Sequence, residues 1–195
     1  RDTDRSRGLG DVYKRQIVDT GMVLLQRDAY QVILRDMKAC LGYCLDLAKK
    51  YNHTVMAGRT HVVHAIPITF GYKAAVWADE LGRDIERIEA VAPRVFVGEM
   101  SGAVGTLASQ PEKGLETQKR MMEILGLGVP TIAWHVARDS QAEFASVLAL
   151  CAGTLGRINH EILTLQRTEI LELEEPFFMG KVGSSTICLL YTSDA

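Results

Sequence analysis

The chain is poor in the residues that define several common classes of protein. Its 195 residues include four cysteines and no Cys-x-x-Cys pair, which argues against a disulfide framework or a zinc ribbon. No apolar run reaches the roughly 18 residues that a membrane-spanning helix needs, and the polar stretch 1–7 is unlike a signal peptide. The net charge is only −2, whereas nucleic-acid and anionic-membrane binders carry a basic surplus. We therefore expect a cytoplasmic protein with no nucleic-acid or membrane partner, no metal and no cofactor.

Proline is also scarce, and none of the five prolines lies between residues 131 and 175. Because proline breaks helix interiors, this gap permits a long helix. Apolar residues recur there at alternating spacings of four and three, which form one heptad-type seam: Phe144, Leu148, Cys151, Leu155, Ile158, Ile162 and Leu165. The pattern predicts a helix over 142–172.

Helical patterns also occupy the segments at about 20–50, 70–96 and 114–126. Asp19 or Thr20 is the expected N-cap of the first, and glycines end the last. Strand-like residues are brief, at 54–56 and 94–97. These patterns predict an all-α protein built as a long-helix bundle. Helices of 30 residues span about 45 Å and usually bury their seams against other subunits, so we expect an oligomer.

Three glycine-containing polar loops interrupt these helices, at 57–69, 98–109 and 176–186. The first brings together Arg59, Thr60, His61 and His64. A guanidinium can hold a carboxylate by two hydrogen bonds, and an imidazole can move a proton near neutral pH. Alternatively, the two histidines satisfy local backbone groups. A zinc site is not favoured, because no third ligand cluster accompanies the two histidines.

The second loop contains Ser101, Gly102 and Thr106, whose backbone amides could cradle an anion. It lacks the Gly-Lys-Ser/Thr of a P-loop, and its glycines also suit a turn with positive φ. The third loop, with Ser184 and Ser185, has the composition of a flexible linker. A fourth block, 134–139, could bind substrate or cap the long helix.

Taken together and in this order, the three loops resemble the conserved regions of the fumarase/aspartase superfamily. The segments that carry the likeness are 58–71, 101–106 and 183–186, and the likeness extends over about 17–186. Within the superfamily the chain is most similar to the adenylosuccinate lyases and the 3-carboxy-cis,cis-muconate cycloisomerases. The segment 165–175 resembles the former, whereas Trp134 and His135 resemble the latter.

The two ends depart from the superfamily pattern. After Thr186 the signature loop continues Met-Pro-x-Lys-x-Asn in the superfamily, but here the chain reads Ile187 to Tyr191. We expect residues 1–16 to be a non-native leader and 187–195 a non-native tail. Residues 17–186 would then be a partial central helical lyase domain, an internal piece of a longer chain.

The resemblance implies an incomplete form of the superfamily's central helical domain and a lyase that releases fumarate by β-elimination. The first expectation is cleavage of adenylosuccinate to AMP and fumarate in purine biosynthesis. The alternatives are a cycloisomerase of aromatic catabolism and a non-catalytic structural helical protein. The substrate would be a small molecule carrying two carboxylates, and the longer parent would be a homotetramer with shared active sites. The chain as written is expected to be inactive.

By the same resemblance, each loop residue acquires a role. Ser184 would be the base that removes a proton beside a carboxylate, and His61 the acid or its partner. The substrate-binding residues would be Arg59, Thr60, His64, Ser101, Gly102, Thr106, Arg138 and Ser185. A serine is a poor base unless amide dipoles or a cation stabilise its alkoxide.

Overall fold

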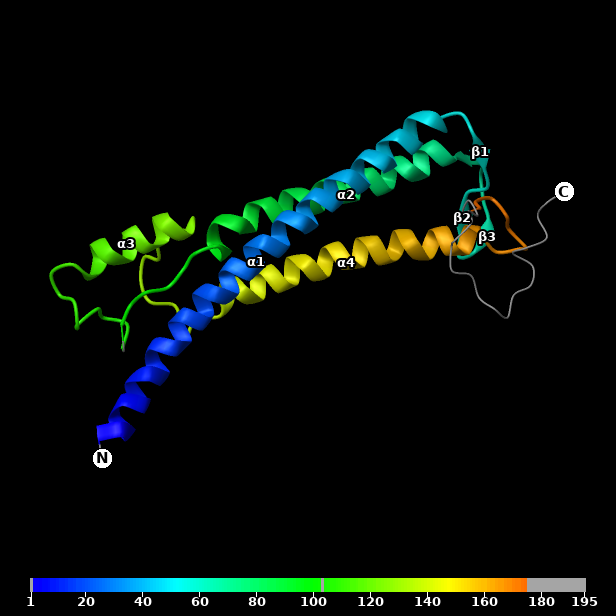
Figure 1. Ribbon diagram of the computed structural model, residues 1–195. Coiled ribbons are helices and arrows are strands. Elements are labelled where there is room, and N and C mark those ends of the chain that lie inside the picture. The colour runs from blue at the N-terminus through cyan, green and yellow to red at the C-terminus, as the bar shows by residue number, and fades with distance from the viewer. Residues whose placement is uncertain (1, 103, 175–195) are drawn as a thin grey trace, which may run out of the picture. The chain divides into compact units, whose positions relative to one another are not determined.

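The computed structural model describes residues 2–102 and 104–174, with side chains from Gln16 onward (Figure 1). Four helices account for most of them: α1 (Asp2–Lys50), α2 (Phe70–Val95), α3 (Gly114–Leu125) and α4 (Asp139–Leu165). Four two-residue strands lie between α1 and α2: β1 (Val55–Met56), β2 (Arg59–Thr60), β3 (Val63–His64) and β4 (Ile68–Thr69). The predicted all-α, long-helix class is therefore confirmed. A boundary between two compact units falls after Thr154, within α4.

The second half of α1 lies antiparallel against α2 (Figure 1). At one end the rings of Tyr30 and Phe96 meet edge to face, with centroids 5.0 Å apart. Midway, Lys38 Nζ lies 2.6 Å from Glu89 Oε1. At the other end, α2 begins where Gly71 lies directly against the backbone of the last turn of α1. The buried face of α2 repeats at helical spacing, which agrees with the helical pattern at 70–96: Ala74, Trp77, Leu81, Ile85, Ile88 and Val95.

The first half of α4 packs antiparallel to α2. Phe144 stacks edge to face on Phe96 with centroids 5.8 Å apart. Further along α4, Thr154 Oγ1 donates a hydrogen bond of 2.6 Å to Oδ2 of Asp84 on α2. Asp84 is only 2% exposed. Phe96 thus joins three helices, because it contacts both α1 and α4.

A second cluster of apolar side chains holds α3 against α1. Val23 and Met122 are fully buried at its centre, with Leu127 beside them. The helix ends as predicted at Gly126, which takes a left-handed φ of 64°. Arg27 of α1 donates a 2.7 Å bond to the Leu125 carbonyl, one of the acceptors that a helix end leaves open.

Three sequence predictions need correction. Neither Asp19 nor Thr20 caps a helix, because α1 begins at Asp2 and both residues make tertiary contacts from within it. The last long helix stops at Leu165 rather than 172, where the Leu165 carbonyl accepts the amides of Glu172 and Leu173. Residues 94–95 form the last turn of α2 rather than a strand, and Val97 makes a single bridge to Gly128.

Among the described residues, no helix is both long enough and apolar enough to cross a membrane. The strand prediction at 54–56 is confirmed in part, since β1 pairs with β4. The β2–β3 hairpin was not predicted, because two-residue strands leave almost no periodic signal in a sequence.

Candidate functional site

The first polar loop is a β-hairpin. Arg59 and Thr60 pair antiparallel with His64 and Val63, so only two residues connect the strands. Both have left-handed backbones, with φ of 52° at His61 and 59° at Val62. The loop also requires glycine at position 58, where a Cβ atom would collide with the Ile66 carbonyl oxygen. This turn type suits the twist of paired strands but is strained for a β-branched residue such as valine.

The hairpin gathers four predicted site residues. Arg59 Nη2 lies 3.4 Å from His64 Nε2, so these two side chains meet across the strand pair. Thr60 and His61 are exposed to solvent. The hairpin therefore presents a guanidinium, a hydroxyl and two imidazoles on one small exposed element.

The second polar loop is held by the N-terminal half of α1. Thr20 Oγ1 accepts a 2.9 Å bond from the Glu99 amide and donates a 3.0 Å bond to the Glu99 carbonyl. One turn earlier, Gln16 accepts from the Ser101 amide at 3.0 Å and donates to the Gly102 carbonyl at 2.6 Å. These four bonds satisfy buried backbone groups that a loop would otherwise leave unpaired. They fix the position of residues 99–102.

A carboxylate that sequence reasoning missed lies at the centre of this region. The Glu99 side chain is 0% exposed. Its Oε1 accepts from Ser101 Oγ at 3.2 Å and from the His135 amide at 3.1 Å, and lies 3.0 Å from His135 Nδ1. A single glutamate beside a glycine has no spacing signal, so no sequence pattern predicts that its side chain is buried. Ser101, predicted to bind substrate, is 2% exposed and directs its hydroxyl to Glu99.

Arg138 is also engaged within the protein. Its guanidinium holds both carboxylate oxygens of Asp19, at 2.9 and 3.0 Å, and donates to the His135 carbonyl at 2.9 Å. The hydrogen bonds that Arg138 donates to the Asp19 carboxylate raise the pKa of Arg138, which therefore stays charged. The guanidinium also lies over the Trp134 ring, 5.8 Å from its centroid. The indole in turn donates to the Gly98 carbonyl at 3.0 Å.

The other predicted site residues are two glycines, a threonine and two serines. Gly102 and Gly105 have φ of 75° and 85°, which confirms the expected positive-φ turn. Thr106 is exposed. Ser184 and Ser185 lie outside the described residues. Within the described part of the chain, no group of three histidines, cysteines or carboxylates could hold a metal ion.

The two loops lie at opposite ends of the helix pair. The hairpin follows the end of α1 at Lys50, whereas the 98–102 loop is bonded to Gln16 and Thr20. Thirty residues of helix, or about 45 Å, separate Thr20 from Lys50. The structure brings Ser101, Gly102 and Arg138 together around Glu99 and His135, but it does not bring them to the hairpin.

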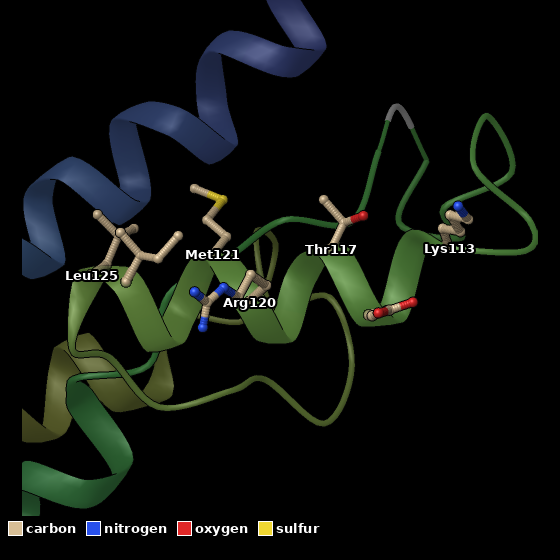
Figure 2. Close-up of a pocket in the computed structure, with 7 residues that line it drawn as sticks. Lys113, Thr117, Arg120, Met121 and Leu125 are labelled. Atoms are coloured by element: carbon tan, nitrogen blue, oxygen red, sulfur yellow. The ribbon is translucent and has the colours of Figure 1, made fainter.

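A hollow of about 500 Å³ lies along α3 (Figure 2). Its lining comes from Lys113 and from six residues of α3: Glu116, Thr117, Arg120, Met121, Ile124 and Leu125. None of these residues was predicted to belong to the site.

Long antiparallel helices carrying polar loops at both ends agree with the fold that the fumarase/aspartase resemblance implies, a helical lyase domain. A solved fumarate lyase from Mesorhizobium sp. BNC1 matches with a TM-score of 0.80 and 46% identity, covering 83% of this chain and 38% of that one. A family model described as lyase matches residues 14–187. The chain belongs to this lyase family.

The curated relatives act on different compounds. The chain is 50% identical to an N-acetyl-S-(2-succino)cysteine lyase of Enterococcus italicus, over 89% of this chain and 38% of the relative. It is 46% identical to an adenylosuccinate lyase of Pyrococcus abyssi, over 88% and 38%. It is 39% identical to a 3-carboxy-cis,cis-muconate cycloisomerase of Acinetobacter baylyi, over 89% and 38%. The chain thus spans about 38% of the length of each.

Proposed function

We propose that the chain supplies part of the active sites of a lyase that releases fumarate from a succinyl adduct by β-elimination. The observation that carries the proposal is the hairpin, where His61 occupies a strained, exposed turn beside the paired Arg59 and His64. Strained backbone persists mainly where function requires it. In a member of a lyase family, this arrangement fits a site that binds carboxylates and transfers protons.

The reaction assigns a task to each group. A base removes a proton from the carbon beside a carboxylate, and we assign this role to Ser184. The bond from the neighbouring carbon to nitrogen or sulfur then breaks, its electron pair leaves with the heteroatom, and the C=C bond of fumarate forms. His61 donates a proton to the leaving atom. Arg59, Thr60 and His64 bind a carboxylate, and Ser185 helps to hold the negative charge that develops.

A complete site requires more than one copy of the chain. The hairpin and the 98–102 loop are held at opposite ends of about 45 Å of helix, so no small substrate reaches both within one chain. A second copy packed antiparallel would bring one copy's hairpin to the other copy's 98–102 loop. This supports the homotetramer with shared sites that the resemblance implies.

Three substrates follow from the relatives. N-acetyl-S-(2-succino)cysteine comes first because the relative at 50% identity is a lyase for that compound. Adenylosuccinate, the first expectation from the sequence, comes second. 3-Carboxy-cis,cis-muconate is third, with a lactone as its product. Trp134 is the residue to compare, since adenylosuccinate lyases usually have glutamine there.

The test is a chimaera in which residues 17–186 replace the corresponding part of the Enterococcus italicus enzyme. Each of the three compounds is supplied, and fumarate and lactone are measured by proton NMR. We expect fumarate from one of the two succinyl compounds and no lactone. Lactone without fumarate would favour the cycloisomerase, and no product from any compound would overturn the proposal. The 195-residue chain alone is expected to show no measurable activity.

A further inference from the structure

The proposed elimination leaves the buried carboxylate of Glu99 without a role. Burying a charge is costly unless the charge is paired and hydrogen-bonded. Glu99 Oε1 has three partners, of which His135 Nδ1, at 3.0 Å, is the one that can carry a positive charge. The other two are the hydroxyl of Ser101 and the backbone amide of His135. A buried acid that bonds both the backbone and the ring of one histidine fixes that ring in place.

One side of the His135 ring, at Cε1, lies next to Gly105 of the second polar loop. With Nδ1 engaged by Glu99, Nε2 is the nitrogen left for another partner. The side chain is 28% exposed, in contrast to the fully buried Glu99. Its Cε1 atom, which adjoins Nε2, lies 3.6 Å from where a Cβ atom on Gly105 would be. The imidazole therefore lies beside Gly105.

Two polar side chains near His135 already have partners in the protein. The Ser101 hydroxyl donates to Glu99, and the Arg138 guanidinium is held by both oxygens of Asp19. With Nδ1 directed to Glu99, His135 has its other ring nitrogen, Nε2, on the opposite side of the ring. A hydrogen bond from an N–H to an ionised carboxylate is stronger than one to a neutral acceptor.

We propose that His135 binds a carboxylate of the substrate through Nε2, and that Glu99 is the positioning residue that fixes the ring. The inference rests on the proposed function, because the succinyl group is the source of that carboxylate. The contact with the substrate carboxylate would lie at this end of the helix pair. Ser101 cannot make that contact while its hydroxyl donates its hydrogen bond to Glu99.

The direct test uses the full 195-residue chain labelled with ¹⁵N and ¹³C at histidine. Fumarate is titrated in, and the ring signals are followed by NMR. Fumaramide, which has the same shape without charge, is the ligand control. We expect fumarate to shift the His135 Nε2 and Cε1 signals and fumaramide to leave them unchanged. An unmoved His135 signal, or an equal response to fumaramide, overturns the proposal.

The role of Glu99 is tested by a double-mutant cycle with Glu99→Gln and His135→Gln. Each single variant is expected to weaken fumarate binding about tenfold, the value of one hydrogen bond to a charged group. The double variant should bind no more weakly than His135→Gln alone, because Glu99 acts through His135. His160→Gln, on α4, is the matched control and should bind as the parent does. Additive losses would show that Glu99 has only a structural role.

Kinetics in the chimaera separate this inference from the proposed function. We expect His135→Gln to raise KM about tenfold while kcat changes less than about threefold. If the chimaera forms fumarate and His135→Gln leaves KM unchanged, the inference fails and the proposed function stands. If the chimaera forms no fumarate while the chain still binds it at His135, the proposed function fails and the carboxylate contact stands.

Discussion

At the scale of single residues, the polar side chains of α1 do more than its sequence pattern indicates. Asp19 and Thr20 belong to the residue types that cap helices, and their position before an apolar seam favoured that interpretation. In the structure they lie inside the helix, where Asp19 holds Arg138 and Thr20 holds the backbone of Glu99. These contacts join residues some 80 to 120 positions apart. No local pattern carries that information.

Val62 provides a prediction at the same scale. It has a φ of 59° and is 90% exposed. Its left-handed backbone is therefore strained, and its side chain has almost no packing contacts that would offset the strain. Asparagine tolerates this conformation, and a β-branched residue does not. We expect Val62→Asn to raise the free energy of unfolding by about 1 kcal/mol, measured by urea denaturation followed by circular dichroism.

Val63→Asn is the matched control, since Val63 is the next residue and lies in strand β3. It should be neutral or destabilising, because asparagine is disfavoured in strands. If Val62→Asn proves no more stable than Val63→Asn, the strain attributed to the turn is absent.

At the scale of elements, the helices were the most predictable feature. Their apolar residues repeat at helical spacing over many turns, and the scarcity of proline permits long helices. The central parts of the helices could therefore be predicted from the sequence. The ends were less predictable. The last long helix ends at Leu165, although polar helix-forming residues continue beyond it. The helix ends in a turn in which the Leu165 carbonyl accepts the amides of Glu172 and Leu173. The spacing of apolar residues in a sequence does not predict such hydrogen bonds.

Two glycines of α2, Gly71 and Gly82, allow a test of the close backbone approach between α1 and α2. A Cβ atom on Gly71 would lie 2.5 Å from Asn52 Cα and 2.6 Å from the Ala48 carbonyl oxygen. Neither contact can relax without moving backbone. We expect Gly71→Ala to lower the free energy of unfolding by about 2 kcal/mol.

Gly82→Ala serves as the comparison within the same helix. A Cβ atom there meets nothing within 4 Å, so the substitution should stabilise α2 by about 1 kcal/mol. Urea unfolding of the two variants in parallel measures both effects. Similar changes at the two positions would contradict the close backbone approach between α1 and α2.

At the scale of the whole molecule, the candidate site is divided. The hairpin residues and the order of the loops could be predicted from the sequence by resemblance. Glu99 and His135 could not be assigned, because their roles arise only from the burial of one side chain against another segment. Arg59 and Ser101 were assigned to one site, yet in one chain they lie at opposite ends of α1. Our proposal of a site shared among several copies rests on this separation.

In the lyase function that we propose, His61 donates the proton to the leaving atom. The most direct measurement is the rate of fumarate formation by the chimaera with and without His61→Gln. We expect the substitution to lower kcat at least about 100-fold, with the helical circular dichroism signal unchanged. A folded His61→Gln chimaera that still forms fumarate at the parent rate would contradict the account.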